Sequence, residues 1–183
     1  MSDREFDVVI FGASGYTGKL VAEYMHDQYG NDHSIKYAIA GRNIEKLLEV
    51  KKDLGLNQDI SILEVDSSNL DSLDKMTRSA RCILTTVGPY QLYGSKLVES
   101  SARNGTDYVD LTGEPGWMYE MINAHKETAQ KSGARIVFSC GFDSIPFDLG
   151  VYFVQNAAKE KFGKPAPHAV SYTHLTLPTK VTV

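Results

Sequence analysis

The chain has 183 residues, a net charge of −4 and a pI near 5.7, which exclude the basic surface typical of nucleic-acid-binding proteins. Hydrophobic residues make up 42% and charged residues 23%, ordinary values for a globular protein that buries one domain. No apolar run approaches the about 20 residues that a membrane-spanning helix needs.

Short apolar runs alternate along the chain with longer segments of helical periodicity. The runs that predict strands are Phe6–Phe11, Ile35–Ala40, Ile60–Val65, Cys82–Val87, Tyr108–Leu111 and Arg135–Ser139. The segments that predict helices are Gly18–Gln28, Ile44–Leu54, Leu70–Ser79, Ser95–Asn104 and Met118–Lys131, with another beginning near Phe147. Asn43 and Asn69 stand where helix amino-terminal caps belong, and Gly105 and Gly133 follow helix ends. This alternation predicts an α/β fold with a doubly wound parallel sheet, the Rossmann fold, in strand order 3-2-1-4-5-6.

The composition changes near residue 162. Phe162–Pro167 ends the last helix, so we expect a domain at residues 1–161 and a disordered or foreign tail at 162–183. Within that tail, Val170–Thr179 resembles the translation of a sequencing adapter, which would mean that the gene was cut short. A native polar strand and turn is the alternative.

The two cysteines and the amino terminus bear on the compartment. Cys82 and Cys140 lie in or beside apolar runs, which favours two buried thiols in a reducing compartment over a disulfide. Residues 1–7 are charged and lack the apolar centre of a signal peptide. We therefore expect a cytoplasmic protein, and we expect no metal site.

A glycine-rich turn follows the first predicted strand and opens a helix. In such turns the first glycine permits a tight turn, the second lets a pyrophosphate approach the backbone, and the third lets the helix pack on the sheet. Amides at the helix start then face the phosphate charge. The residues predicted to bind a dinucleotide here are Gly12, Ser14, Gly15, Tyr16, Thr17 and Gly18. A turn with only a structural role is the alternative.

The residues after the second and third strands predict which dinucleotide is bound. An NAD enzyme usually has Asp or Glu after the second strand, where it accepts hydrogen bonds from the ribose. This chain has Arg42 there, and a guanidinium can pair with a 2′-phosphate through two parallel hydrogen bonds. Arg42 therefore favours NADP(H), with an ordinary surface arginine as the alternative. Asp66, after the third strand, is predicted to lie at the adenine edge; helix capping by Asp66 or Ser67 explains it equally well.

The later strand ends supply the remaining candidates. After the fourth strand, Gly88 and the rigid Pro89 would keep the wall beside the nicotinamide ribose thin, although a plain turn explains the same pair. Ligands bind outside the carboxyl ends of parallel strands, so we expect Tyr90, Glu114 and Asp143 to converge on one rim. Asp143 and the serine after it could instead cap the next helix.

Five motifs occur in one order over about residues 5–160: FGASGYTG, AGRN, TTVGPYQLYG, GTDYVDLTGEP and CGFDSIPFDLGV. Together they resemble the saccharopine dehydrogenase-like oxidoreductases, and most of all the branch of trans-acting enoyl reductases, which serve bacterial glycolipid and polyketide assembly. The resemblance implies a nicotinamide-binding Rossmann domain followed by a mixed α/β substrate domain, which would be missing here by truncation. The cofactor loop, Arg42, Gly88–Tyr90, Glu114 and Asp143 match the family pattern.

These observations lead to a functional hypothesis. We expect an NADPH-dependent oxidoreductase, an enoyl reductase on a lipid or polyketide acyl chain, of which this chain is the cofactor-binding and inactive fragment. Tyr90 would donate to the enolate charge that hydride addition builds. The alternatives are an imino-acid (C=N) reductase, with Asp143 as the acid, and a non-catalytic NADP-binding scaffold. The partners to consider are a small-molecule or acyl-chain substrate, a lipid surface touched peripherally and a second copy of the full-length protein.

Overall fold

A computed structural model describes residues 4–30 and 34–171, and it divides into two compact units, Met1–Gly141 and Phe142–Val183. The first unit carries the sheet, and the second carries helix α7 (Ile145–Phe162). Residues 172–183 of the predicted tail lie outside the described part of the chain. The predicted domain boundary near residue 161 and the adapter origin of the tail therefore stay predictions.

The sheet of the first unit is parallel throughout and has the strand order β3-β2-β1-β4-β5-β6. Its strands are β1 (Phe6–Phe11), β2 (Tyr37–Gly41), β3 (Ser61–Glu64), β4 (Ala80–Thr85), β5 (Asp107–Val109) and β6 (Ile136–Val137). The predicted fold class and strand order are confirmed.

The observed strand bounds differ from the predicted ones where hydrogen-bonded pairing with a neighbouring strand, and not the run of apolar residues, determines where a strand begins or ends. Ala80 pairs with Phe6, so β4 begins two residues before the predicted run, although the charged Arg81 interrupts the apolar pattern. Strand β6 pairs with β5 only through Ile136 and Val137, because it lies at the edge of the sheet, where no other strand of the described chain pairs with it. The flanking apolar residues continue into loops.

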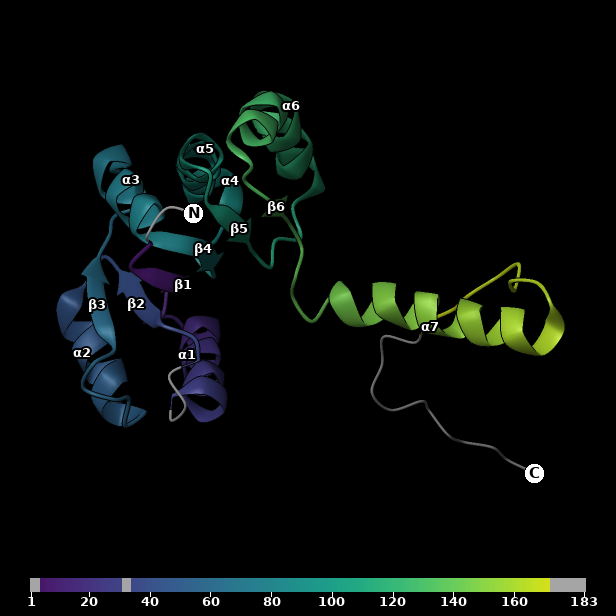
Figure 1. Ribbon diagram of the computed structural model, residues 1–183, viewed down its shortest axis with the longest axis horizontal. Coiled ribbons are helices and arrows are strands. Elements are labelled where there is room, and N and C mark those ends of the chain that lie inside the picture. Colours follow the sequence, from purple (N-terminus) through teal and green to yellow (C-terminus); the bar gives the residue numbers. More distant parts are fainter. Residues whose placement is uncertain (1–3, 31–33, 172–183) are drawn as a thin grey trace. The chain divides into compact units, whose positions relative to one another are not determined.

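Helices cover both faces of the sheet. They are α1 (Tyr16–Tyr29), α2 (Ile44–Asp53), α3 (Leu70–Ser79), α4 (Tyr90–Tyr93), α5 (Ser95–Asn104) and α6 (Pro115–Ser132). Figure 1 shows α1 and α2 on one side of the sheet and α3, α5 and α6 on the other. Alternate residues of β1 serve the two faces: Ile10 packs in the cluster with α1 and α2, whereas Val9 and Phe11 pack in the cluster with α3, α5 and α6.

The predicted helix boundaries agree with the structure where a cap defines them. The side-chain oxygens of Asn43 and Asn69 accept hydrogen bonds from the amides of Lys46 (2.9 Å) and Ser72 (3.2 Å). Gly105 and Gly133 end their helices with φ of 65° and 82°. Helix α6 begins at Pro115, three residues before the predicted start, because proline fits the first turn of a helix.

Two further features concern the cysteines and the apolar character of the helices. Cys82, in β4, and Cys140, after β6, are free thiols, and both are half-buried where the sequence predicted burial. Within residues 4–30 and 34–171, no helix combines the length and the apolar character that crossing a bilayer requires.

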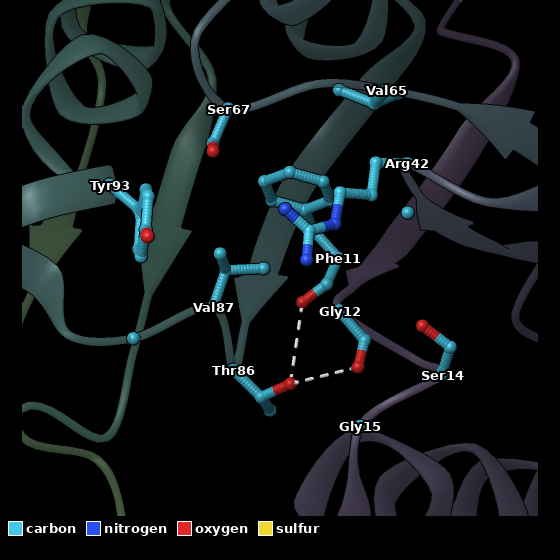
Figure 2. Close-up of a pocket in the computed structure, with 12 residues that line it drawn as sticks. Phe11, Gly12, Ser14, Gly15, Arg42, Val65, Ser67, Thr86, Val87 and Tyr93 are labelled. Carbon is cyan, nitrogen blue, oxygen red and sulfur yellow. Dashed lines mark hydrogen bonds between the residues drawn. The ribbon is translucent and has the colours of Figure 1, made fainter.

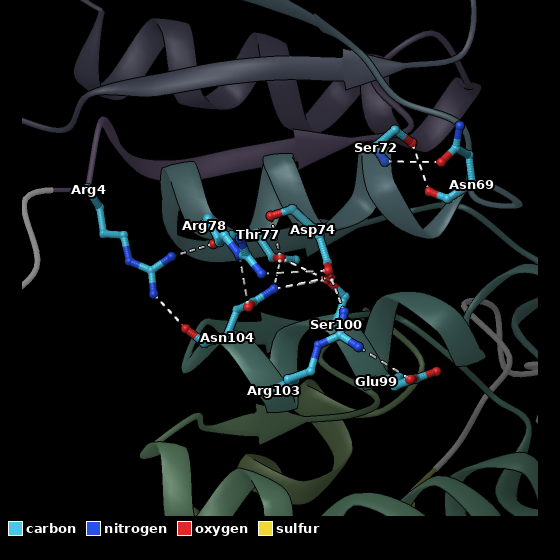
Figure 3. Close-up of polar contacts among 10 residues, drawn as sticks. All are labelled: Arg4, Asn69, Ser72, Asp74, Thr77, Arg78, Glu99, Ser100, Arg103 and Asn104. Carbon is cyan, nitrogen blue, oxygen red and sulfur yellow. Dashed lines mark hydrogen bonds and ion pairs between the residues drawn. The ribbon is translucent and has the colours of Figure 1, made fainter.

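A polar cluster centred on Asp74 joins α3 to α5 (Figure 3). Asp74 Oδ1 accepts hydrogen bonds from Ser100 Oγ (2.6 Å) and Asn104 Nδ2 (3.2 Å), and its Oδ2 accepts one from Arg103. Arg4 reaches the same cluster, donating to the backbone oxygen of Asn104 at 2.6 Å. The carboxylate therefore ties two helices together, and the arginine ties the start of the chain to them.

We expect Asp74→Asn to destabilise the fold in a pH-dependent way. Burial favours a raised pKa for Asp74, but the hydrogen bonds from Arg103, Ser100 and Asn104 hold the pKa below its ordinary 3.8. A carboxylate whose folded pKa is lowered stabilises the fold above its unfolded pKa, and this contribution is lost as pH falls through the folded pKa. The variant should lose about 1–2 kcal/mol of unfolding free energy at pH 7, with a smaller loss below about pH 4.

Urea denaturation at both pH values measures this difference. The matched control is Asp53→Asn, because Asp53 is 59% exposed and pairs only with Lys19 among the described residues. That control should change the free energy of unfolding by less than about 0.5 kcal/mol. Equal losses of unfolding free energy in the two variants would contradict the role of the ionised cluster. A loss in Asp74→Asn that is the same at pH 7 and at acidic pH would also contradict it.

Candidate functional site

The turn after β1 brings α1 closer to the sheet than a side chain would allow. Gly12 has φ of 96°, and a Cβ there would lie 2.7 Å from Thr86 Oγ1. A Cβ on Gly18 would lie 2.1 Å from the backbone oxygen of Gly12, which cannot move aside. Gly15 is different: its φ is −83°, and a Cβ would meet only Gly12 O, at 3.3 Å. A structural turn therefore explains Gly12 and Gly18 but leaves Gly15 unexplained.

A pocket opens over this turn at the carboxyl ends of β1 to β4 (Figure 2). It is lined by Phe11, Gly12, Ser14, Gly15, Gly41, Arg42, Val65, Ser67, Thr86, Val87, Gly88 and Tyr93. Its volume of about 230 Å³ is below the range of roughly 300–1,000 Å³ that encloses a drug-sized ligand, so it suits one half of a dinucleotide. Strand order explains the position, because the chain crosses from β1 to β2 on one side and later to β4 on the other.

The floor of the pocket is held by the end of β4. Thr86 N donates to Phe11 O at 2.9 Å, which continues the β1–β4 pairing by one residue. The Thr86 hydroxyl lies 3.4 Å from Phe11 O and 3.3 Å from Gly12 O and shares its one proton between these two acceptors. Thr86 therefore fixes the glycine turn against the neighbouring loop, a contact that the sequence did not reveal.

Half of the residues predicted to bind the cofactor line this pocket: Gly12, Ser14, Gly15, Arg42 and Gly88. The others are not among its described lining residues: Tyr16, Thr17, Gly18, Asp66 and Pro89. Gly18 instead packs on Gly12, and the Tyr16 side chain is 86% exposed at the start of α1. Contact with the cofactor stays a prediction for all of them.

Arg42 extends into the pocket from the loop after β2 (Figure 2). It forms no hydrogen bond or ion pair with another described residue. The neighbouring carboxylate, Asp66, accepts hydrogen bonds from the backbone amide and the hydroxyl of Ser68, both at 2.8 Å. These bonds lower the pKa of Asp66, so Asp66 shapes its own loop while Ser67 lines the pocket. The charge of Arg42 also helps to lower the pKa of Asp66, but the guanidinium keeps its hydrogen-bond donors available for an anion.

Tyr90 faces the interior instead of the rim. Its hydroxyl donates to Thr85 O at 3.1 Å and accepts from Leu111 N at 3.4 Å, and burial raises the pKa of Tyr90 to about 12. Its ring packs on Trp117, with 5.6 Å between ring centroids. The expected convergence on the rim is therefore not found for this hydroxyl, because the aromatic ring is needed in the core. A proton-donor role for Tyr90 stays untested.

The other two rim candidates have different surroundings. The Glu114 carboxylate accepts hydrogen bonds from the amides of Tyr90 (2.8 Å) and Gln91 (2.9 Å), at the start of α4. Asp143 belongs to the second unit, ahead of α7. Capping by the Ser144 side chain, one of the alternatives, is not seen, since only the backbone oxygen of Ser144 accepts bonds from the helix. A catalytic role for Asp143 stays a prediction.

Comparison with known proteins shows which family the sequence matches. The sequence model of the saccharopine dehydrogenase NADP binding domain matches residues 8–137, which include the whole pocket. The chain is 46% identical over 150 residues to the trans-acting enoyl reductase of Mycobacterium leprae, covering 81% of this chain and 35% of that protein. It is 37% identical over 177 residues to the lipid droplet localized protein of Caenorhabditis elegans, covering 93% and 40%. The chain thus spans about two fifths or less of these relatives.

Among solved structures, the fold is similar to that of the apo saccharopine dehydrogenase (L-Glu forming) of Saccharomyces cerevisiae. The TM-score is 0.65 at 18% identity, over 84% of this chain and 32% of that chain. Identity this low supports the shared fold alone.

The contrast between the glycines gives a test of the pocket. We expect Gly15→Val to weaken NADPH binding by about tenfold or more while the fold survives, because the side chain would occupy ligand space. Gly18→Ala should instead lower the free energy of unfolding by about 1–3 kcal/mol through its backbone clash.

Calorimetric titration and thermal melts of each variant separate the two effects. Gly116→Val is the matched control, since a Cβ at Gly116 meets no described atom within 4 Å. The assignment of Gly15 to the ligand fails if the folded Gly15→Val protein binds NADPH as tightly as this control.

Proposed function

The chain belongs to the saccharopine dehydrogenase NADP-binding domain family, and on this premise we propose that it is the cofactor-binding part of an NADPH-dependent enoyl reductase. The observation that carries the cofactor choice is the guanidinium of Arg42 after β2, which lines the pocket and has no hydrogen bond or ion pair to another described residue. No acidic residue is among the described residues that line the pocket, so no carboxylate there opposes a 2′-phosphate. This charge pattern suits NADP(H) and does not suit the ribose hydroxyls of NAD.

Different residues of the pocket would bind different groups of the cofactor. The amides at the start of α1 would hold the pyrophosphate near Gly15, and Arg42 would pair with the 2′-phosphate. Ser14 adds a hydroxyl between these two positions. When bound, NADPH supplies a hydride from its nicotinamide ring. The protein orients that ring and keeps water away from it.

The substrate side of the proposal rests on the relatives. The Mycobacterium leprae relative is named a trans-acting enoyl reductase, which supports reduction of a C=C bond in an acyl chain. The name of the Caenorhabditis elegans relative supports peripheral association with lipid. Hydride addition to an enoyl group leaves enolate charge that needs a donor. To donate its proton to the enolate, Tyr90 would first have to break its hydrogen bond to Thr85 O. Asp143 is the other candidate for the proton donor.

Two alternative functions, the cellular compartment and the oligomeric state also belong to the proposal. Imino-acid (C=N) reduction is the second candidate, because the matching family model is that of the saccharopine dehydrogenase NADP binding domain. A non-catalytic NADP-binding scaffold is the third. The free thiols Cys82 and Cys140 fit a reducing compartment, which supports our proposal of a cytoplasmic protein. A homodimer of the full-length protein stays a prediction.

Cofactor choice gives the first test. The wild-type chain should bind NADPH about tenfold to hundredfold more tightly than NADH, since a charge-assisted bidentate contact contributes about 1.5–3 kcal/mol. Arg42→Ala should remove this preference by weakening NADPH binding and leaving NADH binding unchanged. Arg81→Ala, which changes an exposed arginine paired with Asp7, should keep the preference. Equal affinity of the wild type for both cofactors would overturn the assignment of Arg42.

Reaction type gives the second test, made on the full-length protein. We expect it to oxidise NADPH with an enoyl thioester and not with an imine formed from an amino acid and a keto acid. Arg42→Ala should raise the KM for NADPH at least about tenfold and change kcat little, because the phosphate contact is equal in ground and transition states. Turnover of the imine alone would favour the saccharopine-type reaction. NADPH binding without turnover of either substrate would favour the scaffold.

A further inference from the structure

Tyr93 is an exposed aromatic side chain in a concave site. It is 42% exposed and lines the pocket together with Val65, Ser67 and Val87. Its hydroxyl makes no hydrogen bond to another described residue. Figure 2 shows its ring on the wall opposite Arg42. A large ring that leaves its face open inside a pocket is suited to a flat ligand group.

The remaining contacts of the pocket indicate which flat group this is. With the pyrophosphate over Gly15 and the 2′-phosphate at Arg42, the base attached to that ribose must extend toward the ends of β3 and β4. Ser67 and the small apolar side chain of Val87 line the pocket there, so the base would lie against them. Tyr93 supplies the only aromatic ring on that side among the described lining residues, since Phe11 lies in the core at 2% exposure.

We propose that Tyr93 is the platform on which the adenine ring of the cofactor stacks, and that Glu114 is the positioning residue that holds this platform in place. The proposal rests on the proposed NADP(H) site and assigns a further residue to it. Stacking on an aromatic ring gives affinity for the base without reading its edge, so it complements the charge-based choice made at Arg42.

The platform needs an external anchor because α4 has four residues, too few for a helix that is stable by itself. Glu114 supplies the anchor by accepting from both first amides of α4, those of Tyr90 and Gln91. The helix then carries Tyr93, whose amide donates to Pro89 O at 3.1 Å. The wall of the pocket is thereby set before the ligand arrives.

Trp117 closes the other side of this anchor. Its indole packs on Tyr90, and a Cβ at Gly94 would lie 2.6 Å from its ring. Its Nε1 donates to Ser95 Oγ at 2.9 Å. Because Trp117 is the single tryptophan of the chain, its emission reports the seating of α4 directly.

The first experiment measures the affinity of the chain for NADPH and for 2′,5′-ADP, which keeps the adenine and the 2′-phosphate but has no nicotinamide. Tyr93→Ala should weaken both ligands by about tenfold or more, and Tyr93→Phe should stay within about twofold of wild type. Tyr119→Ala is the matched control, since Tyr119 is 70% exposed on α6 and does not line the pocket. It should bind both ligands as the wild type does.

The outcomes separate this proposal from the one on which it rests. Unchanged affinity of Tyr93→Ala, in a chain whose wild type prefers NADPH, would overturn stacking and leave the proposed function standing. A loss for NADPH alone would place Tyr93 at the nicotinamide half and would also overturn it. A wild-type chain that binds neither ligand would overturn both proposals.

The second experiment tests Glu114 as a positioning residue. Glu114→Gln can accept only one of the two amide bonds, because the other side-chain atom becomes a donor. In the folded variant, affinity for 2′,5′-ADP should fall about threefold or more, and Trp117 emission should shift. Lower thermal stability with unchanged affinity and unchanged emission would mean a structural role only and would overturn the positioning role.

Discussion

The close contact between helix α1 and the turn after β1 is the constraint on which the rest of the site depends. It exists because Gly12 and Gly18 have no side chains, so the start of the helix lies directly against a backbone carbonyl. The first amides of α1 therefore lie at the carboxyl end of β1, which is the central strand between β2 and β4. The loops that follow these strands then meet over the turn, and their side chains become the walls of one pocket.

Among the described residues that line this pocket, Arg42 is the one with a cationic side chain. The nearby carboxylates are used on backbone amides: Asp66 binds the loop after β3, Asp110 binds the amides of Thr112 and Ser139, and Glu114 binds the start of α4. Each of them shapes a loop without adding negative charge to the lining. The guanidinium of Arg42 makes no hydrogen bond or ion pair within residues 4–30 and 34–171, so an anionic ligand can satisfy its donors.

The sequence predicted those features of the fold and the pocket that depend on residues close together in the chain. Strand order, the glycine turn and the place of Arg42 follow from spacing along the chain, and the structure contains each of them. Helix α4 was not predicted, because four residues show no periodicity and its anchor, Glu114, lies 24 residues away. The same long-range packing buries Tyr90 against Trp117 and leaves Tyr93 to line the pocket, which spacing alone could not distinguish.

A crystal structure of this chain with NADP⁺ bound tests the central claim most directly, because it places every group of the cofactor at once. The account predicts the pyrophosphate over Gly15 at the start of α1, the 2′-phosphate on Arg42 and the adenine between Ser67 and the ring of Tyr93. Cofactor density in any other place, or a 2′-phosphate turned to solvent away from Arg42, would contradict it.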